Sequence, residues 1–220
     1  MIEKIVIYGI GKLAELLSYS IKENNMYEIS AYAADKEYIS QESYNNLHLV
    51  DFENIENIYP PDKYKMFVLV GYKSMRARKN AFLKAKEKGY RFVNYIDKSA
   101  ILSNDAVIGE NNILSPGIFL ECFGKIGDNN VIRPKTYIGH DFEIGSHNYI
   151  SPCCNIASSC IIGNLNFIGI GTTITDKRHI SDETLIGAAS LVVKDTEPHS
   201  KYIGSPAKKV GEHKDTGIIL

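Results

Sequence analysis

Residues 138–174 read IGHDFEIGSHNYISPCCNIASSCIIGNLNFIGIGTTI, with isoleucine at every sixth position. The same spacing continues in both directions without a polar member or an insertion. The full series has sixteen aliphatic residues: Leu102, Ile108, Leu114, Leu120, Ile126, Ile132, Ile138, Ile144, Ile150, Ile156, Ile162, Ile168, Ile174, Ile180, Ile186 and Val192.

A period of six fits neither a helix, which repeats every 3.6 residues, nor a strand, which alternates every two. It fits a coil of three short strands, because each strand with its turn then takes six residues. Each aliphatic side chain points inward and stacks on its equivalent in the next coil, about 4.8 Å away along the axis. Gly109, Gly127, Gly145 and Gly163 are spaced by one coil, so they share one corner, where we expect backbone freedom to matter.

The composition of the chain argues against several classes of function. The chain has 220 residues, 44% of them hydrophobic, and a formal net charge of −1, which gives no sign of a nucleic-acid or membrane-surface partner. The apolar run at residues 5–11, interrupted by glycines, is too short for a membrane span and lacks a signal peptide's cleavage region. The four cysteines lie in the repeat region without zinc-ligand spacing, so we expect small buried thiols in a reducing cytoplasm.

The first 97 residues predict a separate, small parallel α/β domain. Residues 98–220 then form the repeat domain with a C-terminal tail. The expected strands of the first domain are residues 4–8, 27–33, 65–71 and 90–95, and the expected helices are residues 13–24 and 74–88.

Three strand ends of this domain carry residues that suit a ligand. Gly9, Gly11 and Lys12 follow the first strand, where helix-terminal N–H groups can meet a phosphate. Asp35-Lys36 follows the second strand and Gly71-Tyr72-Lys73 the third, so all three lie at the carboxyl edge of a parallel sheet. A tight or solvated turn would also explain each of these strand ends taken alone. The three strand ends together favour a nucleotide-binding site.

His140 is the candidate catalytic residue. The hexad from Ile138 to Glu143 places it near a coil corner, facing outward, with Asp141 or Glu143 able to orient the imidazole. A surface histidine is the alternative reading.

Residues 138–174, LIGAASLVVKD (185–195) and YIGSPAKKV (202–210) resemble the hexapeptide-repeat sugar acetyltransferases of the NeuD and PglD type. The resemblance implies a small Rossmann-like α/β domain followed by a left-handed parallel β-helix. It implies acetyl-CoA as cosubstrate, and as substrate a nucleotide-linked amino sugar, most often a 4-amino-4,6-dideoxy hexose. Some members instead O-acetylate sialic acid. The route would be surface polysaccharide synthesis, such as lipopolysaccharide or O-antigen, in the cytoplasm.

The resemblance also assigns roles to residues of this sequence. His140 is the general base and Asp141 its acidic neighbour. The backbone N–H of Ser158 polarises the thioester, and Tyr149 stands where a second histidine is common, with His147 two residues earlier. Gly9, Gly11, Lys12 and Asp35 match the sugar-nucleotide turn, with Lys12 at a position where histidine is common. Small residues that would let pantetheine approach the backbone include Gly169, Gly171, Gly187 and Ala188.

Three further expectations concern partners and alternatives. Zinc-binding β-helix enzymes use a histidine pair five apart, whereas His140 and His147 are seven apart, so we expect no metal. We expect a homotrimer with parallel axes, because outward residues are apolar: Phe119, Val131, Tyr137, Ile161 and Phe167. A non-catalytic trimeric scaffold is the alternative from another class, although it has no need of the His140-Asp141 pair.

Overall fold

The computed structural model describes residues 2–71 and 73–220, which divide into two compact units. Residues 2–71 with 80–93 form an α/β unit, and residues 73–79 with 94–220 form a β-helix unit. Among the described residues, no helix has the length and apolar character needed to cross a membrane.

The α/β unit contains a five-stranded sheet in the order β3-β4-β2-β1-β5. Every neighbouring pair is parallel except the β3–β4 hairpin. The strands are β1 (Lys4–Tyr8), β2 (Glu28–Ala34), β3 (Ser43–Tyr44), β4 (Leu47–Asp51) and β5 (Lys65–Val68). The helices are α1 (Lys12–Glu23), α2 (Ile55–Ile58) and α3 (Met75–Glu87), with short 3-10 turns at Lys36–Tyr38 and Phe52–Asn54.

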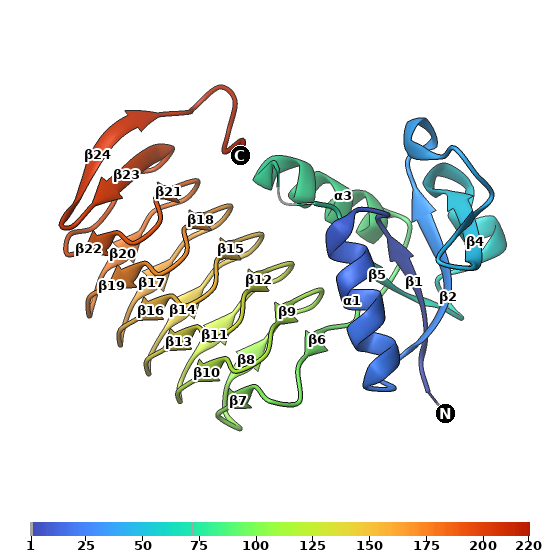
Figure 1. The fold of residues 1–220 in the computed structure, drawn as a ribbon, viewed down its shortest axis with the longest axis horizontal. Helices are drawn as coiled ribbons and strands as arrows, with labels where there is room; N and C mark the ends of the chain where they lie inside the picture. The colour runs from blue at the N-terminus through green and yellow to red at the C-terminus, as the bar shows by residue number, and fades with distance from the viewer. Residues whose placement is uncertain (1, 72) are drawn as a thin grey trace. The chain divides into compact units, whose positions relative to one another are not determined.

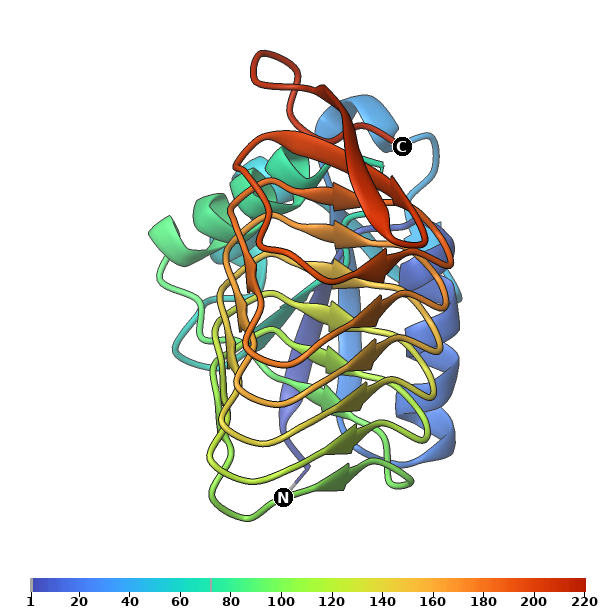
Figure 2. The same cartoon turned by 90° about the vertical axis from the view of Figure 1, so that its left-hand side faces the viewer.

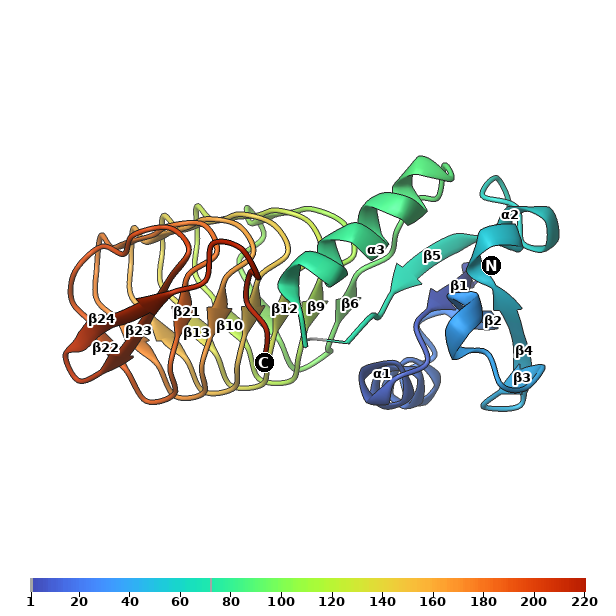
Figure 3. The ribbon, with the colours of Figure 1, turned by 90° about the horizontal axis from the view of Figure 1, so that it is seen from above.

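Both faces of this sheet are buried, which explains the unbroken apolar run of β1. Val6 and Tyr8 pack with Phe82 of α3 on one face, and Ile5 and Ile7 on the other face are also fully buried. Helix α1 buries an apolar stripe that includes Leu13, Ala14, Leu17 and Ile21. Figure 3 shows α1 beside β1 and β2.

The strand predicted over residues 90–95 was wrong as one element. Phe92 makes only an isolated bridge to Met66 in the α/β unit. Tyr95 instead begins β6 (Tyr95–Ile96), which pairs with β9 of the β-helix. The sequence run is continuous, but the two halves add to different sheets.

The β-helix unit is built from three sheets whose coils stack in chain order (Figures 1 and 2), and all their strand pairs are parallel except the terminal β23–β24 hairpin. The β6 sheet contains β6, β9 (Ile113–Leu114), β12 (Val131–Ile132), β15 (Tyr149–Ile150), β18 (Phe167–Ile168), β21 (Leu185–Ile186), β23 (Ser200–Gly204) and β24 (Ala207–Glu212). The β7 sheet contains β7 (Ile101–Leu102), β10 (Phe119–Leu120), β13 (Tyr137–Ile138), β16 (Asn155–Ile156), β19 (Thr173–Ile174) and β22 (Leu191–Val192). The β8 sheet contains β8 (Val107–Ile108), β11 (Lys125–Ile126), β14 (Glu143–Ile144), β17 (Ile161–Ile162) and β20 (His179–Ile180).

The predicted inward stacking of the aliphatic series is confirmed. Residues eighteen apart are paired in register, as Ile138 is with Ile156. Fourteen members are at most 3% exposed and form one continuous core. Leu102 and Ile108 are only partly buried because they belong to the first coil, which is covered on one side only.

The corner glycines have a different role from the one expected. Gly109, Gly127 and Gly145 do not have positive φ angles; a Cβ at each would lie 2.7–2.8 Å from the carbonyl oxygen of the next coil. The left-handed conformation is instead adopted two residues later by non-glycine residues, such as Asn129 (φ 56°) and His147 (φ 66°). Close approach between coils, rather than backbone freedom, requires glycine here.

An asparagine ladder fills one inner corner of the β-helix. The Oδ1 atom of Asn130 accepts the backbone N–H of Asn148 at 2.9 Å, and its Nδ2 donates to the carbonyl of Gly145 at 2.9 Å. The same pattern relates Asn94, Asn112, Asn130, Asn148 and Asn166 at intervals of one coil. These bonds satisfy polar groups that would otherwise be costly to bury. The eighteen-residue spacing of these asparagines is visible in the sequence.

Gly124 leaves the space that the ring of Phe142 occupies in the core. A Cβ at Gly124 would lie 2.0 Å from two atoms of that ring, which is fully buried. We expect Gly124→Ala to lower the stability by about 1–3 kcal/mol through overpacking, and Phe142→Leu in the same chain to restore part of it. Thermal unfolding measures both. Gly211→Ala is the matched control, because nothing lies within 4 Å of a Cβ there; equal losses at both glycines would refute the packing explanation.

The first residues of α3 belong to the β-helix unit. Arg78 is 3% exposed and donates to the carbonyls of Asn129, His147 and Asn148, and burial lowers the pKa of its guanidinium to about 10. Its carbonyl oxygen in turn accepts the Nδ2 of Asn129 at 3.3 Å. These bonds join the beginning of α3 to two successive coils.

Glu183 is a second anchor of this segment. Its carboxylate is 3% exposed and receives two hydrogen bonds of 2.7 Å from Arg76 and one of 2.8 Å from Nδ1 of His199. Arg76 also donates to the carbonyls of Lys214 and Asp215, so the C-terminal tail is held by the same guanidinium. Figure 3 shows the β23–β24 hairpin that precedes this tail at the end of the coils.

Candidate active site

His140 lies in the turn that joins β13 to β14, at a corner of the β-helix. We call residues 139–142 and their equivalents 157–160 in the next coil the His140 corner. Asp141 adopts the left-handed conformation (φ 56°), as Ser159 does one coil later (φ 58°). The backbone N–H of Asp141 donates to the carbonyl of Cys122 at 3.0 Å, so the turn is tied to the coil before it.

The imidazole of His140 pairs with its neighbour. Nδ1 lies 2.8 Å from Oδ2 of Asp141, and both side chains are about half exposed. A carboxylate can only accept, so Nδ1 carries the proton and the lone pair of the neutral ring lies on Nε2. Glu143 is the other candidate for orienting the ring. Its Oε1 lies 4.0 Å from Nζ of Lys125 instead. The corner therefore presents a histidine prepared to accept a proton at Nε2.

Glu121 and Tyr137 were missed by the sequence reading. Oε2 of Glu121 accepts the backbone N–H of His140 at 3.0 Å, and Oε1 accepts the hydroxyl of Tyr137 at 2.8 Å. This hydrogen bond, together with burial, raises the pKa of Tyr137. The signal available in the sequence was weak, because Glu121 precedes His140 by nineteen residues rather than by one whole coil.

The backbone N–H of Ser158 lies at the His140 corner, because Ser158 follows His140 by eighteen residues, which is one coil. Ser159, next in the chain, donates its N–H to the carbonyl of His140 at 2.8 Å. The N–H of Ser158 itself donates to Oδ1 of Asp176 at 3.1 Å. A thioester carbonyl would therefore have to displace the Asp176 carboxylate to use this donor.

The other predicted acetyl-CoA residues lie elsewhere on the β-helix. Gly169 and Gly171 follow β18, and Gly187 and Ala188 follow β21, so they line the corner between the β6 and β7 sheets. Tyr149 is on β15 of the β6 sheet, 8% exposed, and stacks on Phe167 with ring centroids 5.5 Å apart. His147, the alternative to Tyr149 for the second-histidine position, is also 8% exposed. Its Nδ1 lies 3.0 Å from Nδ2 of Asn129. Within one chain these residues are not brought to the His140 corner.

The α/β unit gathers the predicted sugar-nucleotide residues along one edge, because β2, β1 and β5 are adjacent and parallel. Gly9 has φ +131°, and a Cβ there would lie 2.6 Å from the carbonyl oxygen of Leu69, so glycine is required. Gly11 is the N-cap of α1, and Lys12 begins it and pairs with Glu15 at 2.8 Å. Gly71 is exposed beyond β5. Tyr72, in the same predicted strand end, lies outside the described residues.

Asp35 has a structural partner at this edge. The hydroxyl of Tyr8 donates to its Oδ1 at 2.7 Å, and the Tyr8 ring stacks on Phe52 with centroids 3.9 Å apart. Burial and this hydrogen bond raise the pKa of Tyr8. The second oxygen of Asp35 is the one that remains for a ligand, and Lys36 next to it is exposed.

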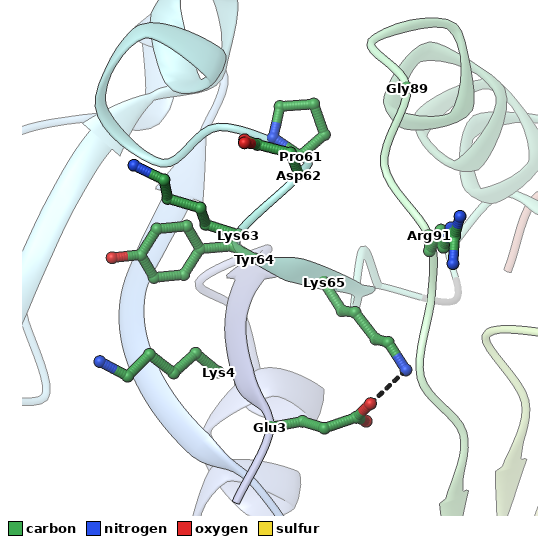
Figure 4. Close-up of a pocket in the computed structure, with 9 residues that line it drawn as sticks. All are labelled: Glu3, Lys4, Pro61, Asp62, Lys63, Tyr64, Lys65, Gly89 and Arg91. Atoms are coloured by element: carbon green, nitrogen blue, oxygen red, sulfur yellow. Dashed lines mark hydrogen bonds and ion pairs between the residues drawn. The ribbon is translucent and has the colours of Figure 1, made fainter. Parts of the chain in front are cut away.

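A cavity of about 620 Å³ lies at the opposite edge of the same sheet, where β1 and β5 begin (Figure 4). Basic side chains line it, including Lys4, Lys63, Lys65 and Arg91. Lys65 is paired with Glu3, and Lys4 and Lys63 extend away from Arg91. Because these cations diverge or are neutralised, the cavity has no convergent set of ligand groups.

Metal ligands and thiols add little to the candidate site. Across residues 2–71 and 73–220, no group of three or more His, Cys, Asp or Glu residues is placed to hold a metal ion. The four cysteines are free; Cys154 and Cys160 are buried, and burial raises the pKa of Cys154 to about 11. The expectation of buried thiols was wrong for Cys153, which is exposed because it occupies a corner.

Comparison with known families supports the reading of the repeat. Residues 124–158 match the family described as bacterial transferase hexapeptide (six repeats). The match supports the six-residue repeat over residues 124–158.

Solved structures match almost the whole chain. A histidine-to-asparagine mutant of perosamine N-acetyltransferase from Caulobacter crescentus, in complex with CoA and GDP-perosamine, is 24% identical with a TM-score of 0.86, over 96% of this chain and 99% of that one. The acetyltransferase domain of PglB from Neisseria gonorrhoeae is 19% identical (TM-score 0.83, 94% and 100% covered). WeeI from Acinetobacter baumannii is 18% identical (TM-score 0.81, 94% and 100% covered). The expected fold class, a small parallel α/β domain followed by a left-handed parallel β-helix, is confirmed.

Proposed function

We propose that this protein transfers the acetyl group of acetyl-CoA to the amino group of a nucleotide-linked amino sugar. The observation that carries the proposal is the His140–Asp141 pair, 2.8 Å apart, on an exposed corner of the β-helix. It is supported by the fold, which the chain shares with a perosamine N-acetyltransferase complexed with CoA and GDP-perosamine. A 4-amino-4,6-dideoxy hexose is the proposed sugar class.

The chemistry follows from the tautomer of His140. An amine attacks a thioester only through its lone pair, and Nε2 of His140 takes the amine proton as the N–C bond forms. Asp141 stabilises the resulting imidazolium and keeps the ring in position. The C–S bond then breaks, the amide remains on the sugar, and the proton passes to the sulfur of CoA. The N–H of Ser158 would stabilise the oxyanion once Asp176 moves aside.

We assign the nucleotide to the carboxyl edge of the α/β unit. Its phosphates would lie at Gly9, Gly11 and Lys12, where the beginning of α1 favours negative charge. Asp35 and Lys36 would contact the base or ribose, with Gly71 beside them.

Acetyl-CoA would lie between two parallel β-helices of a homotrimer. One subunit would supply His140 and Ser158, and its neighbour the corner with Gly169, Gly171, Gly187 and Ala188, as well as Tyr149. This division explains why one chain does not bring the two sets together. The reaction would serve surface polysaccharide synthesis in the cytoplasm.

The trimer is directly testable. Phe119 and Ile161 are 39% and 46% exposed on the outer faces of the coils. Val131, expected among the outward apolar residues, is 1% exposed in the single chain and so is removed from that set. We expect light scattering at micromolar concentration to give three times the mass of one chain, and Ile161→Glu to reduce that mass together with activity. A monomer mass for the unchanged protein would contradict the trimer and the shared site.

Asp35 tests the nucleotide site. We expect Asp35→Ala to raise KM for the nucleotide sugar by about 10-fold, the loss of one charged hydrogen bond, with kcat and KM for acetyl-CoA unchanged. Because Asp35 also accepts from Tyr8, Tyr8→Phe is the control that removes only the internal bond. If Tyr8→Phe raised the sugar KM as much as Asp35→Ala, Asp35 would be only a structural residue.

The function itself is tested by supplying acetyl-CoA with a panel of UDP-, dTDP- and GDP-linked amino sugars and measuring release of free CoA thiol. Sialic acid belongs in the panel, because the same corner could deprotonate a hydroxyl. Turnover on an amino sugar is expected; turnover on sialic acid alone would replace the proposal by O-acetylation. No release with any acceptor would favour the scaffold alternative.

A further inference from the structure

Glu121 holds His140 from the coil that precedes it. Its own backbone N–H donates to the carbonyl of Ile138 at 3.0 Å, and its carboxylate accepts the N–H of His140 at 3.0 Å. The strand residue before Gly139 and the residue after it are therefore both bonded to Glu121. Rotation of the peptide groups around Gly139 would break one of these bonds.

Tyr137 fixes the Glu121 carboxylate in turn. Its hydroxyl donates to the oxygen that His140 does not use, and its ring stacks on Phe119 with centroids 5.9 Å apart. Both carboxylate oxygens are occupied by donors, so the side chain has one favoured position. A hydrogen bond to a charged acceptor is also stronger than one between neutral groups.

The backbone N–H of Ser158 is the equivalent of the His140 N–H one coil later, and its acceptor comes from the following coil rather than from the preceding one. The N–H of Ser158 uses Asp176, which lies eighteen residues after it, whereas the N–H of His140 uses Glu121, nineteen residues before it. The carbonyl of His140 meanwhile accepts from Ser159 in the following coil. His140 is thus held by the preceding coil through its N–H and by the following coil through its carbonyl.

We propose that Glu121, fixed by Tyr137, is a positioning residue that sets the backbone of His140 so that its imidazole meets both Asp141 and the acceptor amine. The kinetic part of this inference rests on the proposed function. The left-handed conformation of Asp141 is shared by corner residues of other coils, such as Asn129 and Ser159, whereas a glutamate carboxylate bonded to the N–H of the preceding residue is the feature that distinguishes this corner. A displacement of about 1 Å at a reacting group costs as much as 100-fold in rate.

Glu121 also contributes charge. Its carboxylate accepts the backbone N–H of His140 at 3.0 Å, and the carboxylate of Asp141 lies 2.8 Å from Nδ1 of the same residue. A negative charge at this place stabilises the imidazolium that forms during the reaction.

The test uses three variants of the full-length protein. Glu121→Ala removes both bonds, Glu121→Gln keeps the shape without the charge, and Tyr137→Phe keeps the ring without the hydroxyl. Glu143→Gln is the matched control, since it neutralises an exposed glutamate on β14 that lies 4.0 Å from Lys125. Circular dichroism and thermal unfolding establish that each variant is folded.

We expect kcat to fall by about 10- to 100-fold for Glu121→Ala and severalfold for Tyr137→Phe, with both KM values within twofold of the unchanged enzyme. Glu121→Gln should retain more activity than Glu121→Ala, because it keeps the shape of the side chain. Wild-type kcat in both Glu121 variants would overturn the proposal.

A measurement independent of turnover separates this inference from the proposed function. NMR spectra of the imidazole nitrogens of His140 give its tautomer in each folded variant. If no acceptor sugar is turned over, loss of the Nδ1–H tautomer in the Glu121 variants still supports positioning. An imidazole that keeps the Nδ1–H tautomer in both Glu121 variants overturns it, whether or not the enzyme is an acetyltransferase.

Discussion

Replacing His140 by asparagine is expected to lower kcat by about 10²- to 10⁴-fold while both substrates still bind. Asparagine keeps a polar group of similar size but cannot take a proton from the amine near neutral pH. Asp141→Asn should cost less, because its carboxylate orients the ring and does not touch the reacting atoms. The measurement is steady-state release of CoA thiol together with the binding affinity of each substrate.

The control for His140 is His48→Asn, because His48 is an exposed histidine on β4 of the α/β unit. His147 is unsuitable for this purpose: it is 8% exposed, occupies a left-handed corner position and hydrogen-bonds Asn129. Near-normal turnover by His140→Asn would mean that another group or water takes the proton.

The second large effect concerns stability and Glu183. Glu183→Ala should lower the free energy of unfolding by about 2–3 kcal/mol, less than the 3–5 kcal/mol of a fully buried pair. The expected loss of stability is smaller because the Arg76 side chain is 37% exposed, so water can partly replace the lost carboxylate. His199 and the carbonyls of the C-terminal tail that Arg76 holds would lose order as well. Thermal and urea unfolding measure the change, and Glu212→Gln, an exposed glutamate paired with Lys209, is the control.

The same residue predicts an acid-sensitive component of stability. Burial alone would raise the pKa of Glu183, but hydrogen bonds from Arg76 and His199 and their charges outweigh it, so the net pKa is lowered. A carboxylate with a depressed pKa stabilises the fold above its unfolded value of about 4.5 and loses that contribution as pH falls through its folded value. The difference between the unchanged protein and Glu183→Ala should therefore shrink below pH of about 4.5. A difference that stayed constant down to pH 3 would exclude the ionic explanation.

Much of the β-helix was determined by the sequence alone. A strict six-residue period leaves one inward position per strand, and burial of an aliphatic side chain there is favourable in every coil, so local spacing specifies the register of the sheets. The same spacing placed His140 and Ser158 on one corner, and the β1 and β2 runs placed Gly9 and Asp35 at one edge of the α/β sheet.

The tertiary structure decided what periodicity does not encode. Glu121 reaches His140 from an offset of nineteen residues, and Tyr8 occupies one oxygen of Asp35, because side-chain reach and direction, unlike coil position, depend on the neighbours that pack around them. The glycines at one corner proved to be needed for close approach between coils. Arg78 reads as a surface residue on a basic helix, yet it is buried against the carbonyls of two coils. Its desolvation is offset only by contacts with residues more than fifty positions away, and no local pattern in the sequence contains those contacts.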